Sequence, residues 1–156
     1  MCIPGNIVPV HPVGPGMTYV ALFTELTRAE IELWNSLDNH LSAEVQLTLA
    51  RFQALDAIDL IGSGARVQDV SERMSITVGA TSKLVDRLER AGLAARESNP
   101  TDRRSSIIVL TPAGSSSLES ARSIAEDHIA SVLGAAIPKA RAIALTSELS
   151  SLRGAL

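Results

Sequence analysis

The hydrophobic period changes partway along the central part of the chain, and this change limits the possible folds more than any other feature. Residues 67–74 and 78–91 space their apolar side chains as amphipathic helices do, and only three residues separate the two segments. Residues 93–97 and 105–110 are short and apolar, and the second run is β-branched, which favours strands. Two helices joined by so short a link, followed by two strands around a polar loop, predict a helix-turn-helix with a β-wing.

The second of these helices, residues 78–91, is expected to have two chemically different faces. The side chains expected to be buried fall at i, i+3, i+4 and i+7, and they are Thr81, Leu84, Val85 and Leu88. Thr77 precedes the helix as a candidate N-cap, and Gly92 follows it as a candidate C-cap. The other face is small, polar and partly basic, so it can approach the floor of a DNA groove. The residues predicted to contact DNA here are Thr77, Val78, Gly79, Ser82, Lys83 and Arg87.

Two further charge patterns belong to this region. Asp86 and Arg90 lie four residues apart, so we expect them to pair along the helix. Asn-Pro begins a turn between the two strands, and Arg103 and Arg104 follow it. Arginines near the tip of a hairpin can reach DNA phosphates or a narrow minor groove. The alternative is that these charges are solvated surface.

The run SKLVDRLERAGL followed by NPTDRRSSIIVLTPAG resembles the winged helix-turn-helix of the MarR family of bacterial transcription regulators. The most specific part is Asp-Arg-Arg leading to Leu-Thr-x-x-Gly, here Asp102, Arg103, Arg104, Leu110, Thr111 and Gly114. The resemblance covers residues 49–118 most strongly. It implies a homodimer that binds a pseudo-palindromic operator and releases it when a small ligand or an oxidant arrives. It also implies that Asp102 supports the wing by holding a wing arginine in place.

The resemblance and the hydrophobic pattern together divide the chain into four segments. Residues 1–16 contain four of the seven prolines and are expected to form a flexible arm, with Met17 as a possible alternative start. Residues 17–47 are expected to form an N-terminal dimerisation helix, and residues 48–110 the DNA-binding domain. Residues 111–156 are expected to form C-terminal dimerisation helices, although these helices could instead pack on their own monomer. The fold class is mainly α with a small β-wing, and residues 65–67 could add a third strand.

Net charge gives weaker guidance about the partner. The whole chain carries a formal charge of −3, whereas residues 66–104 carry eight Lys and Arg against six Asp and Glu, a local excess of +2. The basic excess therefore lies in the predicted DNA-binding segment. The acidic total favours the alternative of a winged helix that binds other proteins without specific DNA binding. A third alternative is a ligand-binding dimer with only residual DNA affinity.

The sequence also contains candidates for an effector pocket. The family usually binds small aromatic acids or phenols between its dimerisation and DNA-binding regions, and the residues that could line such a pocket are Trp34, Arg51, Asp59 and His128. For Trp34 a place in a hydrophobic core or dimer interface is the favoured alternative. His40 and Glu44 could form a metal site with His128, but ordinary surface or half-buried histidines are the favoured interpretation.

The remaining features of the sequence exclude classes of protein and do not assign a function. No motif of a hydrolase, nucleotide-binding loop or zinc protease is present, so we expect no enzyme and no cofactor. Cys2 is the single cysteine, and so low a cysteine count suits a cytoplasmic protein. We interpret Cys2 as an ordinary exposed thiol in preference to an oxidant sensor. No run approaches the roughly 20 apolar residues of a membrane span. We therefore expect a homodimeric, ligand-responsive DNA-binding regulator, most simply a repressor.

Overall fold

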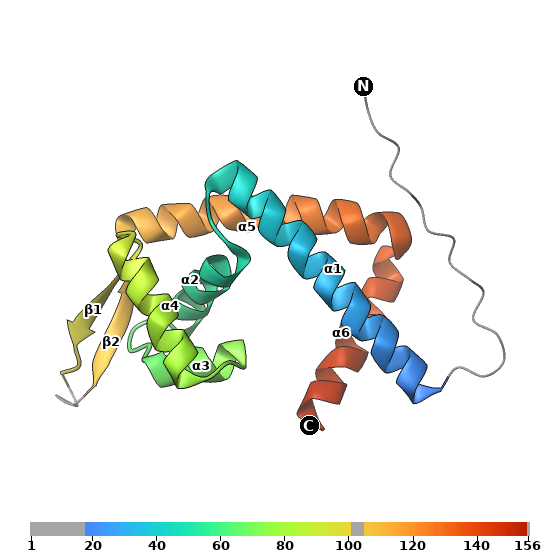
Figure 1. Ribbon diagram of the computed structural model, residues 1–156, viewed down its shortest axis with the longest axis horizontal. Coiled ribbons are helices and arrows are strands. Elements are labelled where there is room, and N and C mark those ends of the chain that lie inside the picture. The colour runs from blue at the N-terminus through green and yellow to red at the C-terminus, as the bar shows by residue number, and fades with distance from the viewer. Residues whose placement is uncertain (1–17, 101–104, 156) are drawn as a thin grey trace. The chain divides into compact units, whose positions relative to one another are not determined.

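The computed structural model describes residues 18–100 and 105–155. Cys2 and the proposed arm lie outside the described residues, as do three wing residues, Asp102, Arg103 and Arg104. The chain divides into two units within its first helix, after Leu33, and each is considered by itself. The elements run in the order α1 (Tyr19–Val45), α2 (Leu49–Ile61), α3 (Val67–Met74), α4 (Val78–Arg90), β1 (Ala94–Ser98), β2 (Ser106–Leu110), α5 (Pro112–Ala136) and α6 (Lys139–Gly154) (Figure 1).

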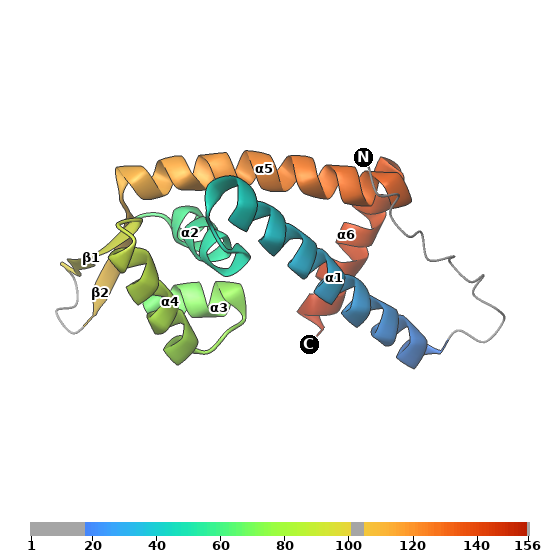
Figure 2. The ribbon, with the colours of Figure 1, turned by 45° about the horizontal axis from the view of Figure 1, so that its top comes forward.

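The expected fold class, mainly helical with a small β-wing, is confirmed. α2 lies between α5 and α3, and the β1–β2 hairpin lies beside α4 in both Figure 1 and Figure 2. The hairpin is antiparallel, with Ala94 opposite Leu110 and Ser98 opposite Ser106. Among the described residues no single helix is long and apolar enough to cross a membrane, although α5 and α6 pass that test together as a bent pair.

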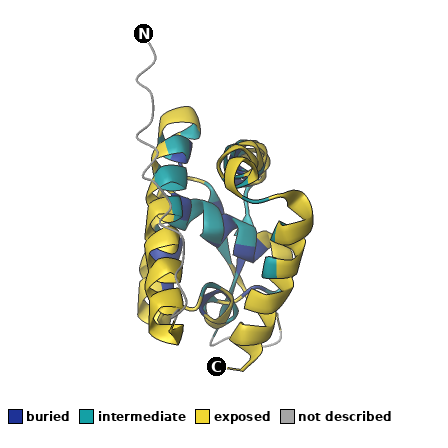
Figure 3. Ribbon diagram, turned by 90° about the vertical axis from the view of Figure 1, so that its right-hand side faces the viewer, coloured by how far each residue is buried: buried dark blue, intermediate teal, exposed yellow. Residues whose placement is uncertain are grey.

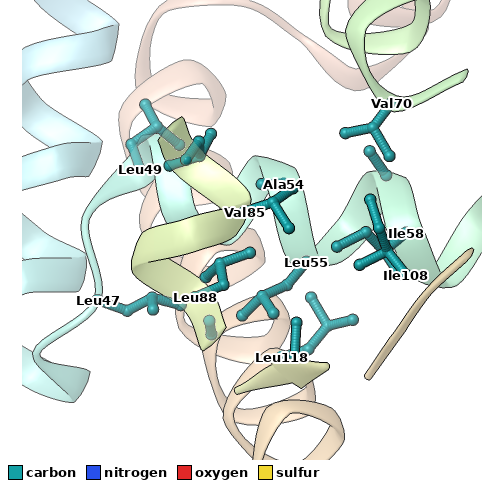
Figure 4. Close-up of a cluster of buried hydrophobic side chains, with 14 of the residues drawn as sticks. Leu47, Leu49, Ala54, Leu55, Ile58, Val70, Val85, Leu88, Ile108 and Leu118 are labelled. Atoms are coloured by element: carbon teal, nitrogen blue, oxygen red, sulfur yellow. The ribbon is translucent and has the colours of Figure 1, made fainter. Parts of the chain in front are cut away.

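One hydrophobic core holds the second unit together. Leu55 and Ile58 of α2 belong to it, together with Leu88 of α4, Ile108 of β2 and Leu118 of α5 (Figure 4). Each of these side chains is at most 2% exposed. Because four different elements fill the same space, the helix-turn-helix, the wing and α5 are fixed relative to one another.

The proposed third strand did not form. Arg66 is the extended N-cap residue of α3 and Val67 is already helical, so only Ala65 remains available for pairing. Its carbonyl accepts one hydrogen bond from the Ile108 N–H at 2.7 Å. The sheet of the described residues therefore contains β1 and β2 alone, with a single bond from the segment before α3.

The connection from the wing to α5 is tightly built. Thr111 is the N-cap of α5, because its hydroxyl accepts the Gly114 N–H at 3.0 Å, and Pro112 takes the first helical position. The same hydroxyl donates to the Gly92 carbonyl at 2.7 Å. Gly92 itself has a φ of +70°, which a residue without a Cβ adopts readily. The end of α4 and the start of α5 are thereby joined directly.

Candidate nucleic-acid interface

The two faces of α4 are those predicted. Its buried residues are Thr81, Leu84, Val85 and Leu88. On the outer face, Thr77, Val78, Gly79, Lys83 and Arg87 are exposed and Ser82 is half-buried. Six residues chosen from the sequence as DNA contacts thus lie on or beside one accessible helix surface. We call this surface, made by Thr77, Val78, Gly79, Ser82, Lys83 and Arg87, the outer face of α4.

Local chemistry fixes where this helix begins. Ser75 adopts a left-handed conformation with φ of 55°, which turns the chain sharply after α3. The Thr77 hydroxyl then accepts the Ala80 N–H at 3.2 Å, as the predicted N-cap. The other backbone N–H groups of the first turn are left without helical partners, and Gly79 places no side chain over them. The amino end of α4 can therefore approach an anion closely.

The basic side chains of the outer face are available to a ligand. Among the described residues, neither Lys83 nor Arg87 has an ion-pair partner, and the two lie four residues apart on the same side of the helix. The two carboxylates of α4, Asp86 and Glu89, both pair with Arg96 of β1. This arrangement favours contacts with phosphate groups.

The expected pair of Asp86 with Arg90 is not present. The Arg90 guanidinium donates through Nε to the backbone carbonyl of Asp86 at 3.1 Å, whereas the Asp86 carboxylate pairs with Arg96 of β1 at 2.7 Å. The physical reason is tertiary, because the chain folds back after Gly92 and brings β1 alongside α4. Spacing within one helix could not reveal a partner on the following strand.

Sequence reasoning also missed Arg96 itself. Its guanidinium contacts both Asp86 and Glu89 of α4, and its backbone N–H donates to the Glu89 carboxylate at 2.9 Å. One available signal was strand alternation. Ala94 is buried, and residues two positions apart on a strand point to the same side. Arg96 is therefore expected to point inward, as Ala94 does.

The described part of the wing ends in a polar base. Asn99 is 8% exposed, and its side-chain amide donates to the Ser105 hydroxyl at 2.8 Å across the two ends of the loop. Arg103 and Arg104, predicted as DNA contacts, and their predicted support Asp102 belong to the loop outside the described residues. Their roles stay predictions.

The four candidates for an effector pocket lie on three helices. Asp59 of α2 pairs at 2.8 Å with Arg122 of α5, which also contacts Asp56. These two carboxylates raise the pKa of Arg122, first through the hydrogen bond to Asp56.

The other candidates have different surroundings. His128 of α5 accepts or donates a hydrogen bond with the Ser36 hydroxyl at 2.9 Å and stacks on His40, with ring centroids 4.3 Å apart. Trp34 is 38% exposed, and Arg51 is half-buried on α2. The structure thus brings His40 to His128, as the metal hypothesis required, but the described residues contain no group of three or more His, Cys, Asp or Glu that could hold a metal ion.

The sequence is similar to those of known helix-turn-helix regulators, which agrees with the geometry of α3, α4 and the wing. Residues 45–105 match the model of the MarR family. The chain is 27% identical over 93 residues to the uncharacterized HTH-type transcriptional regulator YfiV of Bacillus subtilis, covering 60% of this chain and 52% of YfiV. It is 44% identical over 41 residues to the uncharacterized HTH-type regulator YcgE of the same organism, covering 26% of this chain and 27% of YcgE. The matches thus span about half and about a quarter of these two relatives.

Solved structures show the same fold. The transcriptional regulator BldR of Sulfolobus solfataricus superposes with a TM-score of 0.79 at 21% identity, covering 88% of this chain and 96% of BldR. A MarR variant of E. coli complexed with operator DNA gives a TM-score of 0.78 at 21% identity, covering 86% and 94% of the two chains. Proteins of the MarR family are transcription regulators and not enzymes. The resemblance to the MarR family is therefore confirmed over residues 45–105, and the chain has the winged helix-turn-helix fold of these solved structures.

Proposed function

We propose that this protein is a homodimeric, sequence-specific DNA-binding transcription regulator, acting as a repressor that a small-molecule effector releases from its operator. The observation that carries the proposal is the outer face of α4, where Lys83 and Arg87 have no ion-pair partner among the described residues and stand beside the small residues of the first turn. In a winged helix-turn-helix this helix enters the major groove and the wing reaches the flanking backbone. The E. coli MarR variant of similar fold was crystallised with operator DNA.

Homodimerisation is supported by apolar surface that a monomer leaves uncovered. α6 has no buried residue, and Figure 3 shows the helix that ends at the C-terminus mostly in the colour of exposed residues. Ile143, Leu149 and Leu152 of α6 are 65%, 45% and 50% exposed. In the other unit, Tyr19 and Phe23 of α1 are also largely exposed. We propose that residues 17–47 and 111–156 cover these side chains in a dimer, which would place two reading helices about 34 Å apart, one turn of DNA.

Release by an effector is supported by relatives of the same fold. BpsR of Bordetella bronchiseptica, whose DNA binding is regulated by 6-hydroxynicotinic acid, has a solved structure with a TM-score of 0.75 at 24% identity. Another, CouR from Rhodococcus jostii, was bound to p-coumaroyl-CoA. We propose an aromatic effector for this protein as well, held near Trp34, Arg51, Asp59 and His128. A ligand that bound better to one spacing of the two reading helices would shift the dimer away from its operator-binding form.

The experiment is fluorescence anisotropy of the full-length protein with labelled DNA from the region upstream of its own coding sequence. A scrambled duplex serves as competitor, and the titration is repeated over a series of salt concentrations. We expect binding that resists the competitor and whose log K falls linearly with log salt. Light scattering of the same sample is expected to show a dimer.

Absence of binding at low salt would overturn the proposal. The alternative function, a winged helix that binds other proteins, would then be favoured, because the net charge of −3 disfavours general affinity for nucleic acid.

A further inference from the structure

Arg96 of β1 links the wing to α4 through three separate contacts. Its Nη2 lies 2.7 Å from the Asp86 carboxylate, its Nη1 contacts the Glu89 carboxylate, and its backbone N–H donates to Glu89 at 2.9 Å. Asp86 and Glu89 are the two carboxylates of α4. A single residue of β1 therefore pairs with both negative charges of the helix proposed to enter the DNA groove.

The position of these carboxylates makes their pairing matter for DNA. The Asp86 side chain is 46% exposed and lies directly before Arg87 of the outer face. An unpaired carboxylate there would repel approaching phosphates and would compete with them for Arg87 and Lys83. With Arg96 in place the two negative charges already have a cation, so the basic side chains of the outer face stay available to DNA.

The contacts also fix the wing in place. β1 pairs along its whole length with β2, from Ala94 opposite Leu110 to Ser98 opposite Ser106, and the wing loop joins their far ends. Holding Arg96 against α4 therefore fixes the position of the β1–β2 hairpin relative to α4. The side chain is only 27% exposed, which limits screening of its ion pairs by water.

We infer that Arg96 is a positioning residue for DNA binding, which neutralises Asp86 and Glu89 and sets the wing against α4 without itself contacting DNA. This inference rests on the proposed function. Its contribution to DNA binding is expected to be larger than its contribution to stability, because partly exposed ion pairs stabilise proteins by only about 0–1 kcal/mol.

The test compares three full-length variants for binding to the operator: Arg96→Met, Asp86→Asn with Glu89→Gln, and the combination of all three changes. We expect Arg96→Met to weaken binding about tenfold, equivalent to about 1.4 kcal/mol. The triple variant has no carboxylates left to neutralise, so it is expected to recover most of that loss.

The salt dependence separates positioning from direct contact. Since Arg96 is proposed not to touch phosphate, Arg96→Met is expected to leave the slope of log K against log salt unchanged. A slope smaller by about one would show a lost phosphate contact and would overturn the inference. A triple variant that binds DNA as weakly as Arg96→Met would also overturn the inference, because the loss of affinity would then not come from the two carboxylates left unpaired.

Two further measurements keep the test decisive. Thermal unfolding followed by circular dichroism identifies a variant that fails to fold, and Arg96→Lys, which keeps the charge but can satisfy only one carboxylate well, is expected to bind between the unmodified protein and Arg96→Met. If the unmodified protein does not bind DNA, the proposed function fails and takes this inference with it. If it binds and Arg96→Met binds equally, only the inference on Arg96 fails.

Discussion

Gly114 in the first turn of α5 lies directly against the backbone of Leu93, at the entry to β1. A Cβ at position 114 would overlap the Leu93 carbonyl oxygen and would lie 2.8 Å from the carbonyl carbon. That carbonyl also accepts the Thr111 N–H at 3.1 Å. The last residue of the Leu-Thr-x-x-Gly pattern is therefore a glycine because a helix start and a strand start meet there without room for a side chain.

This contact predicts opposite effects for two glycines of the same helix. Gly114→Ala is expected to destabilise the protein by about 2–4 kcal/mol, since the backbone of Leu93 cannot move without disturbing the Thr111 cap. Gly134→Ala, where a Cβ would meet nothing within 4 Å, is expected to be neutral or to stabilise by up to about 1 kcal/mol through helix propensity. Urea unfolding of both variants measures the two free energies. Equal effects would show that the close approach at Gly114 is wrong.

Arg122 predicts a moderate loss of stability when its charge is removed. Its guanidinium donates to Asp56 at 2.9 and 2.7 Å and to Asp59 at 2.8 Å, so it ties α5 to α2. All three side chains are more than a third exposed, so water screens the pairs. Arg122→Met is therefore expected to lower the free energy of unfolding by about 1 kcal/mol. Arg73→Met, at an exposed arginine of α3 without an ion pair among the described residues, is the control, and a loss no larger than that of the control would refute the prediction.

Asp69 predicts a pH-dependent contribution to stability. Its carboxylate accepts the Arg66 guanidinium Nε–H at 3.1 Å and the Arg66 backbone N–H at 2.9 Å, and the side-chain bond is the main cause that lowers the pKa of Asp69. A carboxyl whose pKa is lower in the folded state stabilises that state above its unfolded pKa, about 3.9. The stabilisation is lost as the pH falls through the lower, folded value.

The variant that tests this is Asp69→Asn, which keeps the shape of the side chain and one acceptor oxygen. At pH 7 it is expected to be less stable by about 0.5–1 kcal/mol, because the ion pair is partly exposed. The difference from the unmodified protein is expected to shrink below pH 4, as measured by urea unfolding between pH 3 and 7. Asp127→Asn, at an exposed site without an ion pair among the described residues, is the control. A difference that stayed constant with pH would contradict the assigned carboxylate.

Local features of the sequence were enough to predict most of the helical fold. The Thr77 hydroxyl caps the turn that follows it, and Gly92 takes the positive φ expected of a helix end. The four apolar positions of α4 are buried as their spacing indicated. These features depend on neighbours a few residues away, so periodicity and capping reveal them.

Tertiary pairing was beyond the same reasoning. Asp86 was assigned to Arg90 because four residues separate them, yet Arg96 is the partner, and only the turn after Gly92 determines that. Residues 65–67 were a candidate strand, but the N-terminus of α3 uses two of the three. The dimer contacts and the effector pocket depend on a second copy and a ligand, and residue spacing within one chain contains no information on either.

Lys83 offers the sharpest test of the outer face, because it is one of only two lysines in the chain and is exposed on α4. Lys83→Ala is expected to weaken operator binding by about 1–3 kcal/mol if the ammonium reads a base, and then to reduce the discrimination against the scrambled duplex. If it contacts phosphate instead, operator and scrambled DNA lose affinity alike and the salt slope falls by about one. Fluorescence anisotropy with both duplexes distinguishes these results. Since Lys83 has no ion-pair partner among the described residues, its removal is expected to leave the free energy of unfolding unchanged within about 0.5 kcal/mol. Affinities unchanged for both duplexes would show that this face of α4 does not contact DNA.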